Sequence, residues 1–213
     1  MIEFLAYRLK GRFPGAFRWI EAAARGVTVL RYGRRLRRAS AEAVVRGTVR
    51  GEAAVMRPLG LEDLDALYEF LAAQPEEHLR YFRPHGFDRA ALRAVLGSGA
   101  FLTYGLFVGD RLAAYALLKV APTGSAFIGL LVDRAYTGLG LGRFAVGYLY
   151  WQASKAGLRA RSTISRHNPA SLRSHEAVAK FKIVAELPND YLLIEFPPAR
   201  PEKPVLAVDL AGS

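Results

Sequence analysis

The sequence predicts a mixed α/β fold in which helices cover both faces of a central sheet. Short apolar runs bounded by turn residues alternate along the chain with segments whose apolar residues recur at helical spacing. Hydrophobic residues make up 52% of the 213 positions and charged residues 23%, so wholesale disorder is excluded and one domain can bury a core. We therefore expect one domain with an appendage.

The appendage is basic. Residues 1–50 hold 12 Lys and Arg against 3 Asp and Glu, a net +9, whereas residues 51–213 carry only +2 of the total +11. Within the appendage we expect a helix over 14–26, a strand over 27–32 and a second short helix over 40–49. The chain thus divides into a basic N-terminal extension at 1–50, a main domain at 51–198 and a loosely held Pro-rich tail at 199–213.

The main domain is predicted to contain about seven strands, because seven apolar runs are bounded by turn residues. Gly109 and Asp110 form a two-residue hairpin turn, and Asn168 followed by Pro169 starts a helix. The expected strands are 53–58, 101–108, 112–120, 127–132, 161–165, 182–187 and 191–196. The expected helices are 61–71, 75–82, 88–96, one that opens within 137–142 and ends near Gly157, and one that begins at Asn168.

The most informative stretch runs from Val132 to Gly142, where an apolar strand meets Gly138 and Gly140 and then a helix. Glycines let the backbone approach a ligand, and a helix start offers unpaired N–H groups and the positive end of the dipole, so this turn suits a phosphate. The spacing fails the dinucleotide fingerprint G-x-G-x-x-G, because Arg143 takes the place of its last glycine. A tight turn without a ligand is the alternative interpretation.

The stretch resembles motif A of the GNAT superfamily of acyl-CoA-dependent N-acetyltransferases, V-x-x-x-x-[R/Q]-G-x-G-x-[G/A]. Val132 and the three glycines match, and Thr137 stands where the family usually has Arg or Gln.

A second stretch is similar to motif B of the same family, N-x-x-S-x-x-x-Y-E-x-x-G-F. Asn168 and Ser171 match, His175 takes the place of the tyrosine, and Phe181 follows after one extra residue. The order of strands and helices over 53–196 also fits. The resemblance therefore implies a GNAT-like, mostly antiparallel mixed sheet and makes 51–198 the acetyltransferase domain.

The resemblance implies transfer of an acetyl group from acetyl-CoA to a primary amine by direct attack. The amine belongs to a small molecule, an amino sugar or a protein. Longer-chain N-acyl transfer, and a non-catalytic GNAT-like module that binds acyl-CoA or RNA, remain alternatives. The implied cofactor-binding residues are Leu130, Leu131, Val132, Thr137, Gly138, Leu139, Gly140, Leu141, Gly142, Arg143, Asn168 and Ser171.

Two histidines are the catalytic candidates. The resemblance places His175 where the acid for the leaving thiolate stands, with a polar helix residue as the alternative. His85 follows a turn in the region of the family's acceptor-binding helices, which also contains Glu76, Glu77 and His78. The base is not identified, because no acid lies between Gly124 and Val132, and a water-mediated base stays open.

Several partner and location hypotheses follow from composition. The basic extension can contact RNA or an anionic membrane surface, but we favour packing on the main domain or on a second subunit in a homodimer. A metal site is not expected, because the chain has no cysteine and no two histidines at i and i+4. The absence of cysteine agrees with a cytoplasmic location. Glu3, Arg8 and Lys10 interrupt the first apolar stretch, so no signal peptide is expected.

Overall fold

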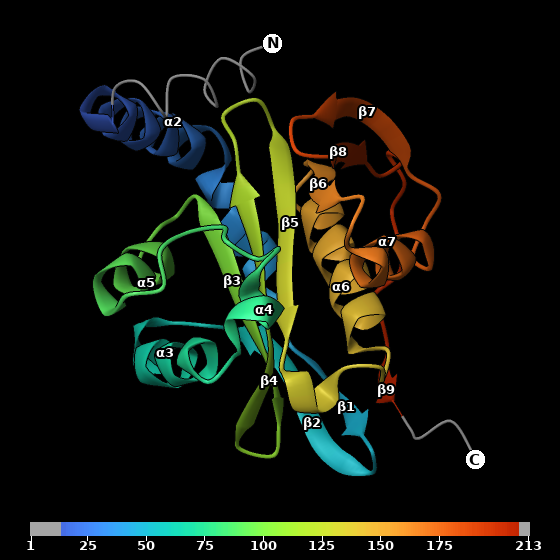
Figure 1. Cartoon of the computed structure of the whole chain (residues 1–213). Helices are drawn as coiled ribbons and strands as arrows, with labels where there is room; N and C mark the ends of the chain where they lie inside the picture. The colour runs from blue at the N-terminus through green and yellow to red at the C-terminus, as the bar shows by residue number, and fades with distance from the viewer. Residues whose placement is uncertain (1–13, 209–213) are drawn as a thin grey trace.

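The computed structural model describes residues 14–208, with side chains described from residue 22 onward. A single sheet of nine strands in the order β7-β8-β6-β5-β4-β3-β2-β1-β9 forms its centre (Figure 1). The strands are β1 Val45–Val49, β2 Glu52–Pro58, β3 Phe101–Val108, β4 Arg111–Val120, β5 Ser125–Val132, β6 Arg159–Ser165, β7 Lys182–Leu187, β8 Tyr191–Glu195 and β9 Leu206–Val208. The helices are α2 Pro14–Ala41, α3 Leu64–Ala72, α4 Glu76–Leu79, α5 Arg89–Leu96, α6 Leu141–Lys155 and α7 Pro169–Glu176, with 3-10 turns Leu61–Asp63 and Arg134–Tyr136.

The sheet is mixed and mostly antiparallel, as predicted. Among the described strands, only the β5–β6 and β1–β9 pairs are parallel. Helices cover both of its faces: α2 and α6 contribute to one buried cluster of side chains, and α3 and α5 contribute to the other. Around β5, helices α3, α4 and α5 lie to one side and α6 and α7 to the other (Figure 1).

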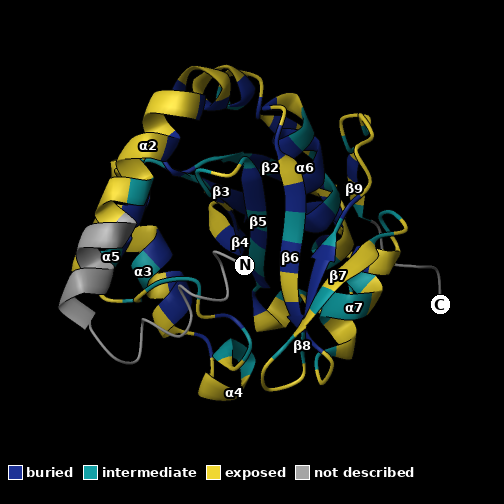
Figure 2. Cartoon of the chain, turned by 90° about the horizontal axis from the view of Figure 1, so that it is seen from above, coloured by how far each residue is buried: buried dark blue, intermediate teal, exposed yellow. Residues whose placement is uncertain are grey.

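The helix predicted to begin at Pro14 is confirmed, but its end at Gly26 and the strand predicted over 27–32 were wrong. One helix, α2, runs through Gly26 and the segment 27–32 that was expected to be a strand. The reason is a stripe at helical spacing, Thr28, Tyr32, Leu36 and Ala39, which is buried against the rest of the fold. Tertiary burial of this stripe outweighs the strand preference of the β-branched residues. Over residues 22–41, most of the remaining surface of α2 is exposed (Figure 2).

The nine strands exceed the expected seven because both flanking segments join the sheet. Residues 45–49 were predicted to be helical but form β1, which pairs antiparallel with β2. In the tail, β9 pairs parallel with β1, so part of the tail is held by the sheet. Gly47 permits this approach, because a Cβ there would lie 1.6 Å from the Leu206 carbonyl oxygen.

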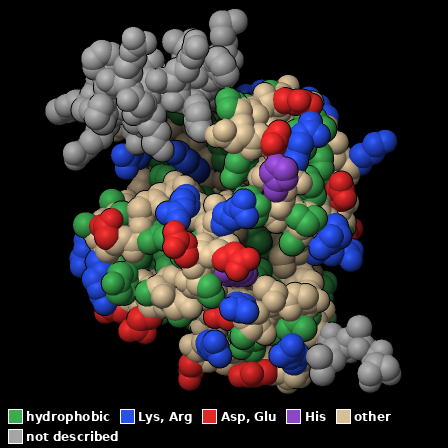
Figure 3. All heavy atoms as spheres, viewed as in Figure 1, with side chains coloured by type: hydrophobic (Ala, Val, Ile, Leu, Met, Phe, Trp, Pro, Cys, Tyr) green, Lys and Arg blue, Asp and Glu red, His purple; other side chains and the backbone are tan. Residues whose placement is uncertain are grey.

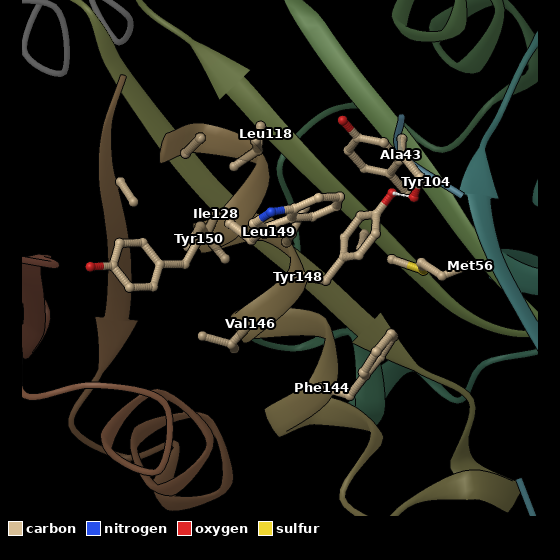
Figure 4. Close-up of a cluster of buried hydrophobic side chains, with 14 of the residues drawn as sticks. Ala43, Met56, Tyr104, Leu118, Ile128, Phe144, Val146, Tyr148, Leu149 and Tyr150 are labelled. Carbon is tan, nitrogen blue, oxygen red and sulfur yellow. Dashed lines mark hydrogen bonds between the residues drawn. The ribbon is translucent and has the colours of Figure 1, made fainter. Parts of the chain in front are cut away.

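A buried aromatic cluster fixes α6 to the sheet (Figure 4). The Tyr148 ring meets the Tyr104 ring edge-on, with centroids 5.0 Å apart. Its hydroxyl donates a 2.7 Å hydrogen bond to the carbonyl of Ala43, which follows α2. Because α6 is anchored in this way, its N-terminus is held in a fixed position beside the end of β5. In the described part of the chain, no helix is long and apolar enough to cross a membrane.

Candidate active site

A cleft opens where two strands of the sheet part. β5 pairs with β4 along its length to Val132, but its parallel pairing with β6 ends at Ile128 and Ser162. Beyond that pair the edges of 129–132 and 163–165 face a cleft of about 1240 Å³. The separation of the strands therefore exposes backbone groups that a continuous sheet would have paired.

The edge of β5 that faces the cleft can be identified from its hydrogen bonds. The Asp133 N–H donates to the Ala113 carbonyl at the end of β4, at 2.8 Å. On the other edge, the Ile128 carbonyl accepts from the Ser162 hydroxyl on β6, at 3.3 Å. Because successive residues of a strand face opposite edges, the N–H groups of Leu130 and Val132 point into the cleft.

A glycine turn and a helix N-terminus close one end of the cleft. Gly138 and Gly140 both have φ of +81°, a conformation that favours glycine, and a Cβ at either would meet no atom within 4 Å. Gly140 is the N-cap of α6 and supplies no side-chain cap. The first N–H groups of α6 are thus available to an anionic ligand.

Two side chains, one after β5 and one after α3, hold this turn in place. The Asp133 carboxylate accepts from the Ala135 N–H at 2.8 Å and caps the 3-10 turn. Gln74, just after α3, donates its amide to Asp133 and accepts from the Arg134 N–H, both at 3.3 Å. Sequence reasoning missed Gln74, because no local pattern signals a partner 59 positions along the chain.

Helix α7 borders the glycine turn. The Asn168 side chain accepts from the Ser171 N–H at 3.1 Å and caps α7, as its position before Pro169 predicted. A Cβ at Gly142 would lie 2.9 Å from the Ser174 hydroxyl. The third glycine of the motif therefore lets α6 and α7 pack closely, which the sequence did not reveal.

His175 lies in the wall of the cleft but is a poor proton donor. It is 2% exposed and its Nδ1–H donates to the Ser171 carbonyl at 2.8 Å, so Nε2 is unprotonated and has no partner among the described residues. Burial lowers the pKa of His175 to about 4, which keeps the imidazole neutral near pH 7. The expected acid for a leaving thiolate is thus not supported by this geometry.

His85 does not line the cleft. Its Nδ1–H donates to the Gly86 carbonyl at 2.7 Å, and its Nε2 accepts from the buried Tyr115 hydroxyl at 2.9 Å. Burial lowers the pKa of His85. One ring nitrogen is bonded within the turn and the other to β4, so the structure does not bring this predicted catalytic residue to the cleft.

The structure brings nearly all of the predicted cofactor residues to the cleft. Leu139 is the exception, because it lies in a separate groove between α6 and the tail. The predicted residues that line the cleft are Leu130, Leu131, Val132, Thr137, Gly138, Gly140, Leu141, Gly142, Arg143, Asn168, Ser171 and His175. Thr137 also donates its hydroxyl to the Arg134 carbonyl at 2.8 Å, which stabilises the turn.

The other side of the cleft is covered by α4 and the segment 80–84 (Figure 1). Here His78 donates from Nε2 to the Val132 carbonyl at 2.7 Å. The charged side chains of this side are Glu77, Arg80, Arg83 and Lys119. Lys and Arg side chains accompany a few acidic ones near the centre of this face of the molecule (Figure 3). Among the described residues, no group of three or more His, Asp or Glu could hold a metal ion.

Comparison with known proteins matches residues 64–181 to the model of the acetyltransferase (GNAT) family. Among curated proteins, no relative matches the sequence. The fold is similar to the GNAT domain of S. lividans PAT, with a TM-score of 0.64, 16% identity and coverage of 73% of this chain and 97% of that one.

Two further solved structures share the fold. One is the PaiA N-acetyltransferase from Thermoplasma acidophilum in complex with coenzyme A (TM-score 0.55, 18% identity, covering 67% of this chain and 98% of that one). The other is the aminoglycoside acetyltransferase AAC(6')-Ib with coenzyme A and kanamycin (TM-score 0.53, 18% identity, 67% and 94%). At these identities the likeness establishes the fold.

Proposed function

The chain belongs to the acetyltransferase (GNAT) family, and we propose that it transfers an acetyl group from acetyl-CoA to a primary amine in this cleft. The observation that carries the proposal is the open edge of β5, where the Leu130 and Val132 N–H groups face the cleft beside the uncapped start of α6. The open strand edge suits an oxyanion and an extended amide chain, and the start of α6 suits a pyrophosphate.

The residues of the α6 and α7 side fit coenzyme A. The turn at Gly138 and Gly140 leaves open space over the first N–H groups of α6, and Arg143 and Arg173 line the same side. The groups of this edge that remain for the amide groups of the pantetheine arm are the Val132 N–H and the Leu130 carbonyl, since His78 occupies the Val132 carbonyl. Bound acetyl-CoA supplies an acetyl group activated as a thioester.

Direct transfer needs the amine to reach the thioester carbonyl, and we expect it to enter from the α4 side of the cleft, opposite the groups proposed for coenzyme A. The amine nitrogen forms the C–N bond, the C–S bond breaks, and coenzyme A leaves as the thiol after it gains a proton. While the carbonyl oxygen carries negative charge, the Leu130 N–H is positioned to donate to it. This donor is a backbone group, so it does not depend on the identity of the side chain.

The rim of the α4 side bears on the acceptor. Arg80, Arg83 and Lys119 line this rim with Glu77, and Glu76 on the same helix lies 3.8 Å from Arg83, so one net positive charge remains. Such a rim does not attract a polycation such as the kanamycin bound by the structural neighbour. The acceptor we propose is therefore an amine that carries few other positive charges or an anionic group, such as an amino acid or a peptide amine.

The test compares two glycines with the same backbone conformation. Gly140→Ala places a Cβ in the phosphate turn, and Gly51→Ala places one in the β1–β2 turn, where φ is +77° and no atom lies within 4 Å. Both variants should lose stability by about 1 kcal/mol from the left-handed conformation. Only Gly140→Ala should weaken acetyl-CoA binding, by tenfold or more, as measured by titration calorimetry. Equal affinity in the two variants would defeat the assignment of the turn.

A further inference from the structure

We propose that His78 is the catalytic base that takes the proton from the acceptor amine. The inference rests on the proposed acetyl transfer and names a residue for a step that the sequence left without one. It comes from the position of one imidazole on the edge of β5.

The hydrogen bond of His78 determines which nitrogen is free. Its Nε2 lies 2.7 Å from the Val132 carbonyl oxygen, which can only accept, so Nε2 carries the proton and Nδ1 keeps a lone pair. Because the N–H and carbonyl of one residue face the same edge of a strand, this carbonyl lies on the edge that also presents the Leu130 N–H. The two groups are separated by nearly three residues of strand, about 9 Å. The His78 ring is therefore held on the same strand edge as the Leu130 N–H, where the thioester carbonyl would bind.

The side from which His78 enters the cleft also matters. It stands on α4, and its ring lines the cleft opposite α6 and α7. The cofactor groups are proposed on the α6 and α7 side, so a base on α4 is on the acceptor's side. The ring is half-buried, which leaves it accessible to an incoming amine.

The other three histidines are unsuited to this step. Both nitrogens of His85 are engaged outside the cleft. The free nitrogen of His175 is buried on the cofactor's side. His167 is exposed and pairs with Asp190 at 3.1 Å. On β5 itself, no residue from Ser125 to Val132 is acidic, so no strand carboxylate competes for the role.

The proton balance is simple. The ammonium form of the acceptor gives one proton to Nδ1 of His78, which frees the nitrogen lone pair for attack on the thioester carbonyl. When the C–N bond has formed and the C–S bond breaks, the second amine proton is lost and the thiolate sulfur gains one. His78 then returns its proton to solvent. The charged groups of the cleft are Glu77 and Arg80 on the segment of His78, Arg83 and Lys119 on the same side, and Arg143 and Arg173 across the cleft. Asp133 follows Val132 and is bound to Gln74 and the Ala135 N–H.

The test is His78→Gln in the full chain, with His85→Gln as the matched control. Glutamine keeps an amide N–H for the Val132 carbonyl but has no basic nitrogen. Coenzyme A thiol release is measured with acetyl-CoA and four probes: glutamate, a peptide with a free N-terminus, spermidine and kanamycin. We expect His78→Gln to lower kcat by about 10²- to 10⁴-fold with unchanged acetyl-CoA affinity, and His85→Gln to keep kcat. The defect should shrink as the pH rises and the amine loses its proton unaided.

Each other outcome overturns the proposal in a distinguishable way. Unchanged kcat in His78→Gln removes His78 while leaving the transfer reaction standing. A loss of acetyl-CoA affinity with normal kcat assigns His78 to holding the β5 edge. A wild-type chain that binds acetyl-CoA but acetylates none of the probes ends both this inference and the proposed function. If the variant does not fold, nitrogen NMR of the wild-type imidazole decides, because a protonated Nδ1 contradicts the base role.

Discussion

The two edges of strand β5 differ in one respect that explains where the site lies. Toward β4, the strand pairs without interruption from Ala126 to Val132. Toward β6, pairing stops at Ile128, although the strand continues for four more residues. The closed edge satisfies its backbone groups within the sheet, and the open edge presents them to the cleft. Recognition of a ligand is therefore concentrated where the fold leaves its own hydrogen bonding incomplete.

The surroundings of the two edges follow the same division. The closed edge leads into β4 and β3, whose side chains are almost all buried. The open edge is bordered by groups from α4, α6 and α7, several of them exposed or half-buried, including His78 and the glycines of the turn. The closed half of the sheet thus holds in position the strand edge at which we propose the chemistry.

The largest expected effect comes from Leu130→Pro, which removes the N–H from the open edge alone. That N–H makes no ladder bond to β4, so the fold should persist, as proline is tolerated on an unpaired strand edge. If the N–H stabilises an oxyanion, kcat should fall by about 10²- to 10³-fold. The measurement is the rate of coenzyme A thiol release with any acceptor that the wild-type chain acetylates.

The neighbouring residue gives the control for the closed edge. Leu131 faces β4, so Leu131→Pro removes a ladder bond and should lower the melting temperature sharply. If Leu130→Pro unfolds the chain as readily as Leu131→Pro does, the backbone N–H groups of both edges of β5 are needed for stability. If Leu130→Pro keeps full activity, the open edge supplies no catalytic donor.

A smaller effect is expected from His175, which separates a structural role from a catalytic one. Its pKa is about 4 in the folded chain and 6.5 as the ordinary value, so below pH 6.5 the unfolded chain binds a proton that the folded chain does not. Stability should therefore fall as the pH drops, by roughly 2 kcal/mol between pH 6.5 and 5. This part of the slope should disappear in His175→Leu.

Denaturant unfolding at several pH values checks this prediction. The comparison of the two proteins isolates His175, because His85, whose pKa burial also lowers, is present in both. An unchanged slope in His175→Leu would mean that the imidazole is protonated in the folded chain, and the role of acid for the leaving thiolate would regain support.

The sequence predicted the parts of this arrangement that are encoded locally. The hairpin at Gly109 and Asp110, the cap at Asn168 and the glycine turn after β5 all depend on residues a few positions apart. The path of α2 was wrong because Gly26 and the run 27–32 were weighed without the partners that bury Thr28 and Tyr32. Tertiary packing decided that element.

The candidate site was predictable to the same extent. The turn and the strand edge follow from a local motif, and almost all of the residues assigned to them line the cleft. The histidines could not be ranked from sequence, because the use of each ring depends on distant partners: Val132 for His78 and Tyr115 for His85. The sequence shows that a histidine lies in the right region. The tautomer of its imidazole, and which ring nitrogen is free, can be learned only from the folded structure.

The smallest effect tests whether the buried contacts that fix α6 to the sheet contribute to stability alone and not to activity. Tyr148→Phe removes the hydroxyl that donates to the Ala43 carbonyl and leaves the ring packing against Tyr104 intact. The buried carbonyl then lacks its partner, which should lower the free energy of unfolding by about 1 to 2 kcal/mol. Acetyl-CoA affinity and kcat should not change, since the bond lies in the core and not at the cleft. Denaturant unfolding measures the loss of stability, and calorimetry measures the acetyl-CoA affinity. A variant that binds acetyl-CoA more weakly would show that α6 transmits strain from the core to the turn at its N-terminus.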